Sequence, residues 1–161
     1  QEIQKLGLLY PTGELGFEHI ERAVLNVARY DVFKLTEAVL AGQHLRVQRM
    51  LDGLQAEGVA EVLVLFTLAE DIRNLKRVKD AVLAGRPLPM ALRELRIWGV
   101  KERLFERIVP GLSATTVDRL LWAAHQVDGI VKGLRPPAWP HDPWQALQRL
   151  AVRFSRFCIV R

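Results

Sequence analysis

The most constraining feature of the sequence is a long segment, residues 60–84, in which apolar residues recur every three or four positions. This spacing predicts a single helix, roughly 36 Å long at a rise of about 1.5 Å per residue. Gly85 and Pro87 follow the segment and are residue types that end helices. The first half of the segment is apolar on nearly all sides, whereas the second half carries basic residues. We therefore expect the first half to be the central buried element of the fold.

The rest of the chain keeps the same spacing, and no convincing run of alternating apolar and polar residues between hairpin turns occurs. The predicted fold class is therefore all-α, a helical bundle. Ser113, and Asp142 followed by Pro143, can accept hydrogen bonds from free backbone amides at helix starts. Besides the long helix, we expect helices over residues 17–28, 45–55, 90–95, 100–109, 114–134 and 144–158, and one between Asp31 and Gly42.

Residue types that carry chemistry in enzymes are scattered along the chain. The 4 histidines stand singly, without the spacing or the cysteine neighbours of a zinc site. Glu70 and Asp71 are adjacent, so their side chains diverge by about 100° around a helix and cannot face each other as acid and base. We expect both on a solvated face. No phosphate-binding glycine loop and no nucleophile beside a base is recognisable, so we expect no catalytic, cofactor-binding or metal-binding residue in this chain.

Composition is that of an ordinary globular protein, with 50% hydrophobic and 25% charged residues. The most apolar run contains Glu61 and meets further charges well before the roughly 20 residues that a membrane span needs, so we expect no membrane contact. Cys158 has no disulfide partner in the chain and suggests a core or semi-buried thiol in a reducing cytoplasm. The net charge of +5 is compatible with nucleic acid without being diagnostic. The start at Gln1, without methionine, suggests a piece of a longer protein.

One basic cluster surrounds a tryptophan at a predicted junction between two helices. Arg93, Arg96, Lys101 and Arg103 flank Trp98 in the stretch LRELRIWGVKER. Basic side chains neutralise phosphates, and an exposed indole can stack on an unpaired base. These residues are therefore candidate DNA contacts. The alternative is that Trp98 caps the hydrophobic core and the arginines are merely solvated.

A second basic spot, Lys132 and Arg135, lies beside the proline-rich loop that contains Trp139. The two cations are also candidate DNA contacts. Prolines and a tryptophan often fix a loop to a helical core, however, so the structural interpretation is favoured for Trp139.

The stretch RYDVFKLTEAVLAGQ combines a helix start and a helix stop with large apolar side chains and no reactive group. Asp31 is a candidate N-cap and Gly42 a candidate helix end, while Tyr30 can pack back on the helix as a hydrophobic staple. Phe33 and Leu35 supply apolar contacts, so the stretch is suited to packing between two helical units. If Phe33 is fully buried, Phe33→Ala should cost roughly 3–5 kcal/mol.

This stretch, followed by LQAEGVAEVLVLFTLAEDIRNL, VDGIVKGL and WQALQRL, resembles the C-terminal part of the delta-subunit family of the bacterial DNA polymerase III clamp loader. The resemblance covers essentially the whole chain. It implies that residues 1–29 end a helical lid-like domain and that residues 30–161 form a helical collar, or oligomerisation, domain. The residues from Tyr30 to Gly42 would then be the joint between the two.

The resemblance also implies a non-enzymatic assembly module within an accessory subunit of the polymerase III holoenzyme. Its partners would be the delta-prime and gamma/tau subunits, which associate through their collar domains. The sliding clamp would be contacted only by an N-terminal domain outside this chain, and the complete assembly would load the clamp on primed DNA. The alternative function is a helical domain that binds single-stranded or primer-template junction DNA through the basic cluster around Trp98.

Overall fold

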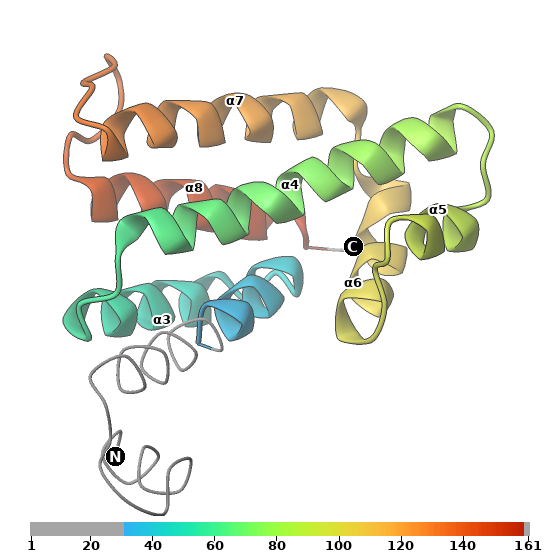
Figure 1. The fold of residues 1–161 in the computed structure, drawn as a ribbon, viewed down its shortest axis with the longest axis horizontal. Helices are drawn as coiled ribbons and strands as arrows, with labels where there is room; N and C mark the ends of the chain where they lie inside the picture. Colours follow the sequence, from blue (N-terminus) through green and yellow to red (C-terminus); the bar gives the residue numbers. More distant parts are fainter. Residues whose placement is uncertain (1–30, 160–161) are drawn as a thin grey trace, which may run out of the picture.

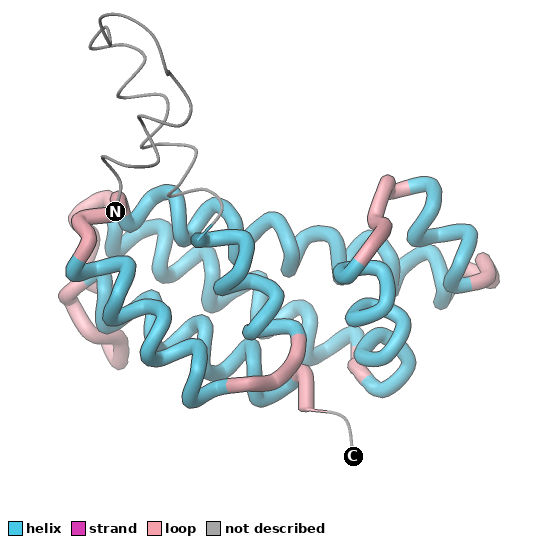
Figure 2. The backbone as a smooth tube through the Cα atoms, turned by 90° about the horizontal axis from the view of Figure 1, so that it is seen from below, coloured by secondary structure: helices cyan, strands magenta, loops and turns pink. Residues whose placement is uncertain are grey.

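The computed structural model of the chain describes residues 31–159, and every regular element in that range is a helix (Figures 1 and 2). This confirms the predicted all-α class. The helix predicted over residues 17–28, Tyr30 and the expected lid-like segment lie outside the described residues. Helix α3 is His44–Ala56, α4 Glu61–Leu83, α5 Leu88–Glu94, α6 Val100–Ile108, α7 Ala114–Val131 and α8 Pro143–Phe157; a 3₁₀ turn, η1, covers Val109–Gly111, and residues 31–40 are helical.

Helix α4 runs the length of the bundle between α7 and α3, with α5 and α6 gathered near one end (Figure 1). It packs most extensively on α7 and also contacts α5 and α8. The residues that it buries are Val64, Leu65, Leu68, Asp71, Ile72, Leu75 and Val78.

The expectation that the first half of α4 is the central buried element is confirmed for Val64, Leu65 and Leu68 only. Val62 and Phe66 are each 61% exposed, because α7 and α8, which pack on α4, leave part of this half of the helix uncovered. The outer face of this half of α4 is therefore apolar and exposed.

Three of the predicted helix-end signals, at Ser113, Asp142 and Gly42, are confirmed. The Ser113 hydroxyl accepts from the Thr116 amide at 3.1 Å, and an Asp142 carboxylate oxygen accepts from the Gln145 amide at 3.0 Å. Gly42 ends the first described helix with φ of +75°, and the following amide of Gln43 donates to a carbonyl one turn back in the helix. A Cβ at Gly42 would also lie 3.0 Å from the Ile159 side chain, so the position requires glycine for two reasons.

The stretch predicted to form the joint between two domains differs from the sequence-based expectation in two respects. Asp31 is already helical, so it does not serve as the predicted N-cap. Leu35 is fully buried, but Phe33 is 53% exposed, so the larger cost expected for a buried Phe33 does not apply.

Cys158 is buried in the core, as expected from the sequence. Burial raises the pKa of its thiol to about 12, and the nearby Asp71 carboxylate adds to this effect. Among residues 31–159, no helix is long and apolar enough to cross a membrane.

Candidate functional site

The corner between α5 and α6 carries Trp98 on its outside. The turn that places it uses left-handed backbone at Arg96, with φ of 57°, and at Gly99, with φ of 71°. The neighbouring Ile97 is buried and fixes the turn to the core, whereas Trp98 is 68% exposed. The interpretation in which Trp98 caps the core therefore does not hold, and the indole is free to contact a partner.

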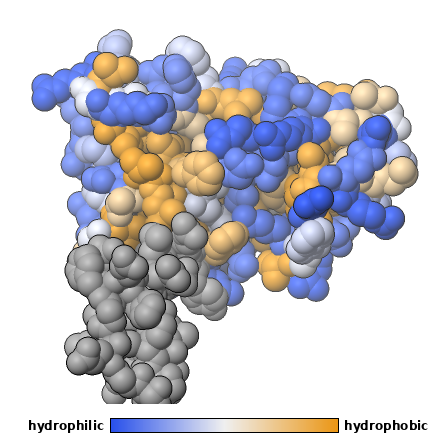
Figure 3. Space-filling model, in the orientation of Figure 1, coloured by the Kyte–Doolittle hydropathy of each residue, from blue (hydrophilic) through white to orange (hydrophobic). Residues whose placement is uncertain are grey.

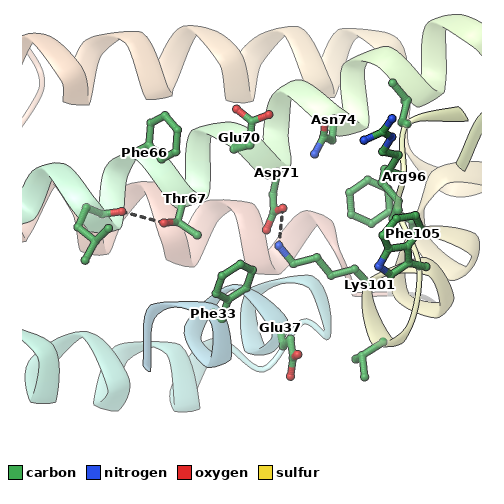
Figure 4. Close-up of a pocket in the computed structure, with 15 residues that line it drawn as sticks. Phe33, Glu37, Phe66, Thr67, Glu70, Asp71, Asn74, Arg96, Lys101 and Phe105 are labelled. Carbon is green, nitrogen blue, oxygen red and sulfur yellow. Dashed lines mark hydrogen bonds and ion pairs between the residues drawn. The ribbon is translucent and has the colours of Figure 1, made fainter. Parts of the chain in front are cut away.

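Trp98 lines a pocket of about 660 Å³ between the helix of residues 31–40, α4 and the α5–α6 corner (Figure 4). We call it the corner pocket. Its aromatic and aliphatic walls include Phe33, Phe66 and Trp98, and its polar residues include Thr67 and Asn74. The charged side chains that line it are Glu37, Glu70, Asp71, Arg96 and Lys101.

A buried ion pair lies at the inner wall of the corner pocket. Lys101 Nζ donates to Asp71 Oδ1 at 2.9 Å, and it lies 5.0 Å from the centroid of the Phe33 ring (Figure 4). Asp71 is only 3% exposed, and its Oδ2 has no hydrogen-bond partner. The expected solvated position is therefore wrong for Asp71, although Glu70 does reach the surface, where it pairs with Arg73 at 3.0 Å.

The environment of Asp71 raises the pKa of its carboxyl group. Burial raises the pKa of the carboxyl above its ordinary value of 3.8; Lys101 opposes this shift and Glu70 adds to it. Asp71 was the important residue that sequence reasoning missed. The signal was its position in the inward stripe of α4, because Val64, Leu68, Asp71 and Leu75 follow each other at spacings of four, three and four.

The predicted DNA-contacting residues around Trp98 separate into two groups. Arg93, Arg96 and Arg103 are exposed, and none of them forms an ion pair within residues 31–159. Lys101, in contrast, is held by Asp71 and is only 23% exposed, so it is not available for a phosphate in this arrangement. Of the three arginines, Arg96 lines the corner pocket together with Trp98.

The second basic spot lies at the opposite end of the bundle, where the chain turns from α7 to α8 (Figure 1). Lys132 is exposed but pairs with Asp128 at 2.8 Å, while Arg135 is exposed in the loop. Trp139 packs against the core, and the guanidinium groups of Arg149 and Arg153 lie 5.2 and 5.4 Å from its ring centroid. This supports the structural interpretation of Trp139, and the structure does not bring the two basic spots together.

A second hollow, of about 380 Å³, lies between α4 and α7. Val62 and Phe66 on α4 and Leu121 and Val131 on α7 supply its large apolar groups; we call these four residues the α4–α7 surface. Figure 3 shows apolar side chains gathered over the first half of α4. Because Phe66 also lines the corner pocket, the two hollows lie on either side of one exposed phenylalanine.

Comparison with known proteins gives two relatives with the same description. The chain is 26% identical over 161 residues to DNA polymerase III subunit delta of Haemophilus influenzae, covering 95% of this chain and 46% of that protein. It is 30% identical over 115 residues to DNA polymerase III subunit delta of Escherichia coli, covering 71% of this chain and 33% of that protein. The chain thus spans less than half the length of either relative. No protein-family model matches it.

Within residues 31–159, no group of three or more histidine, cysteine or acidic side chains could hold a metal ion.

Proposed function

Since the chain is a homologue of the DNA polymerase III delta subunits, we propose that it is a non-catalytic assembly module of a clamp loader. In this proposal residues 30–161 are the collar domain and residues 1–29 end the preceding lid-like domain. The collar contacts the delta-prime and gamma/tau subunits in the cytoplasm. The sliding clamp is contacted by a part of the subunit that lies outside this chain.

The observation that carries the proposal is the α4–α7 surface. Val62 and Phe66 lie on the longest helix of the bundle and are more exposed than expected for apolar residues of a central element. The hollow beside them is lined mainly by aliphatic groups. Adjoining exposed apolar groups of this kind are typical of protein contact sites.

The test is assembly with partner subunits. The chain is mixed with the collar regions of the delta-prime and gamma/tau subunits, and the mass of the complex is measured by light scattering after gel filtration. We expect a defined hetero-oligomer that Val62→Asp disrupts. Leu45→Asp is the matched control, because Leu45 is 63% exposed on α3 and lies outside both hollows. Unchanged assembly of the Val62→Asp variant would exclude this surface, and persistent monomers of the wild-type chain would argue against the collar assignment.

A second function, contact with single-stranded or junction DNA, is favoured by the α5–α6 corner. An exposed indole stands there beside arginines that no acidic side chain of the described region pairs with. Such a corner can stack on an unpaired base and neutralise phosphates. We expect single-stranded DNA binding that falls with added salt and weakens on Trp98→Ala or Arg96→Gln. Binding that ignores both substitutions would rule out this contact.

A further inference from the structure

The corner pocket has walls suited to a flat, uncharged ring. Three exposed aromatic side chains line it: Phe33 at 53%, Phe66 at 61% and Trp98 at 68% exposure. They come from three separate elements, the helix of residues 31–40, α4 and the α5–α6 corner. The volume of about 660 Å³ falls in the range of roughly 300–1,000 Å³ that is usual for small-ligand sites. A nucleobase with its sugar fits this space and presents a π-face to the aromatic groups.

The polar groups of the pocket include both hydrogen-bond acceptors and donors. The Thr67 hydroxyl already donates to the Leu63 carbonyl at 2.8 Å, which leaves its oxygen as an acceptor. Glu37 pairs with Lys34 through Oε2 at 3.5 Å, which leaves its other oxygen as an acceptor, whereas the unpartnered Asp71 Oδ2 is closed off from solvent. Lys101, the cation at the inner wall, is occupied by Asp71. Asn74 differs, because its Oδ1 already accepts from Arg77 at 3.0 Å and its amide nitrogen remains a donor. The pocket therefore offers several acceptors and one amide donor, which suits a base whose amino group stands beside a ring acceptor.

The distribution of charge separates the inside of the pocket from its surroundings. Glu37, Glu70 and Asp71 line it, and their carboxylates would repel a phosphate that entered. Three cations of the α5–α6 region form no ion pair within residues 31–159: Arg96, which lines the pocket, and Arg93 and Arg103 on the flanking helices. Glu102 and Glu106 also lie on α6 and reduce the positive charge of this region. A strand with its phosphates at Arg96 and a base inside matches this arrangement.

We propose that the corner pocket receives one unpaired base bearing an exocyclic amino group from a single DNA strand whose phosphate lies on Arg96. Stacking on Phe66 holds the ring, and the carboxylate and hydroxyl acceptors take the amino hydrogens. Cytosine is accepted better than thymine, which is of similar size but carries a carbonyl in place of the amino group. This inference rests on the DNA contact proposed for the α5–α6 corner.

The test measures fluorescence anisotropy of labelled single strands with the whole 161-residue chain at low salt. The probes are oligo-dC, oligo-dT and an abasic strand of the same length. The variant is Phe66→Ala, and Val62→Ala is the matched control because Val62 is equally exposed, one turn earlier on α4, and lines only the other hollow. Both variants remove an exposed side chain, and an unfolding curve of each verifies that the fold is retained.

We expect Phe66→Ala to weaken oligo-dC binding on the order of 5- to 150-fold, the range that one stacked base provides. Phe66→Ala should not change binding of the abasic strand, and Val62→Ala should not change binding of oligo-dC. The wild-type chain should bind oligo-dC more tightly than oligo-dT. The base-pocket proposal would be overturned if the wild-type chain bound oligo-dC and oligo-dT equally well, or if it bound the abasic strand as tightly as oligo-dC. It would also be overturned if Phe66→Ala had no effect on oligo-dC binding.

Two further outcomes separate the base pocket from the functions on which it rests. If Trp98→Ala and Arg96→Gln weaken binding but Phe66→Ala does not, the DNA contact stands and the base pocket fails. If Phe66→Ala disrupts only assembly with the partner subunits, Phe66 acts through the α4–α7 surface and the base proposal is wrong. Absence of any strand binding by the wild-type chain would overturn both the contact and the pocket.

Discussion

Removal of the amine from the buried Asp71–Lys101 pair should destabilise the chain far more than removal of an exposed lysine. In Lys101→Met, the methionine retains most of the apolar stem, but Asp71 Oδ1 loses the donor at 2.9 Å while Oδ2 already has none. The carboxylate then remains 3% exposed with no counter-charge. Breaking a fully buried pair in this way costs about 3–5 kcal/mol, and because Lys101 keeps 23% of its side chain exposed, we expect a loss near the lower end of that range. That is a large share of a total stability of about 5–15 kcal/mol for a domain.

The measurement is the free energy of unfolding in urea at neutral pH, and Lys132→Met is the control. Lys132 also forms an ion pair with an aspartate, at 2.8 Å, but its side chain is 70% exposed. Exposed pairs between residues four apart on a helix contribute only about 0.3–0.5 kcal/mol, so the control should lose no more than that.

A double variant distinguishes an unpaired charge from a simple loss of packing. In Asp71→Leu combined with Lys101→Met, no charge remains buried, and replacement of a buried pair by apolar groups is often neutral or stabilising by about 1–4 kcal/mol. We therefore expect the double variant to recover most of the stability that Lys101→Met loses. A double variant as unstable as Lys101→Met, or a Lys101→Met loss no larger than that of Lys132→Met, would refute the reasoning.

Three other predictions follow from buried or half-buried groups. The pKa of Asp71 lies above 3.8 in the folded chain, so between these two pH values folding is coupled to the uptake of a proton by this carboxyl group. The free energy of unfolding should therefore gain a contribution from Asp71 as pH falls through the folded-state pKa toward 3.8. Asp71→Asn should remove this part of the pH dependence of unfolding. Phe33→Ala should cost about 1–2 kcal/mol in denaturant unfolding, since the ring is half exposed and its contact with Lys101 adds to the lost burial. Cys158 should react with a thiol reagent at mildly alkaline pH only after unfolding, because burial raises its pKa to about 12; fast labelling of the native chain would contradict this.

Sequence reasoning succeeded where the determining interactions are local. The caps at Ser113 and Asp142 and the glycine end at Gly42 each depend on residues within a few positions, so residue type and spacing are sufficient to predict them. The all-α class follows in the same way from the spacing of apolar residues.

The candidate site could be predicted only in part, because it depends on contacts between distant segments. The cluster around Trp98 was found from its composition, but the exposure of the indole follows from the turn that directs Ile97 inward. The role of Lys101 could not be predicted, since its partner Asp71 lies 30 positions earlier in the chain. The outward position of Phe66 likewise depends on which helices cover α4.

Helix α4 also has a geometric consequence for the two proposed contacts. At about 1.5 Å per residue, Val62 and Asp71 lie about 14 Å apart along this single uninterrupted helix of 23 residues. The Lys101–Asp71 pair fastens the α5–α6 corner to the same helix. A neighbouring subunit bound at Val62 and a DNA strand bound at Trp98 would thus be held at a fixed separation, because both contacts are attached to the same rigid helix.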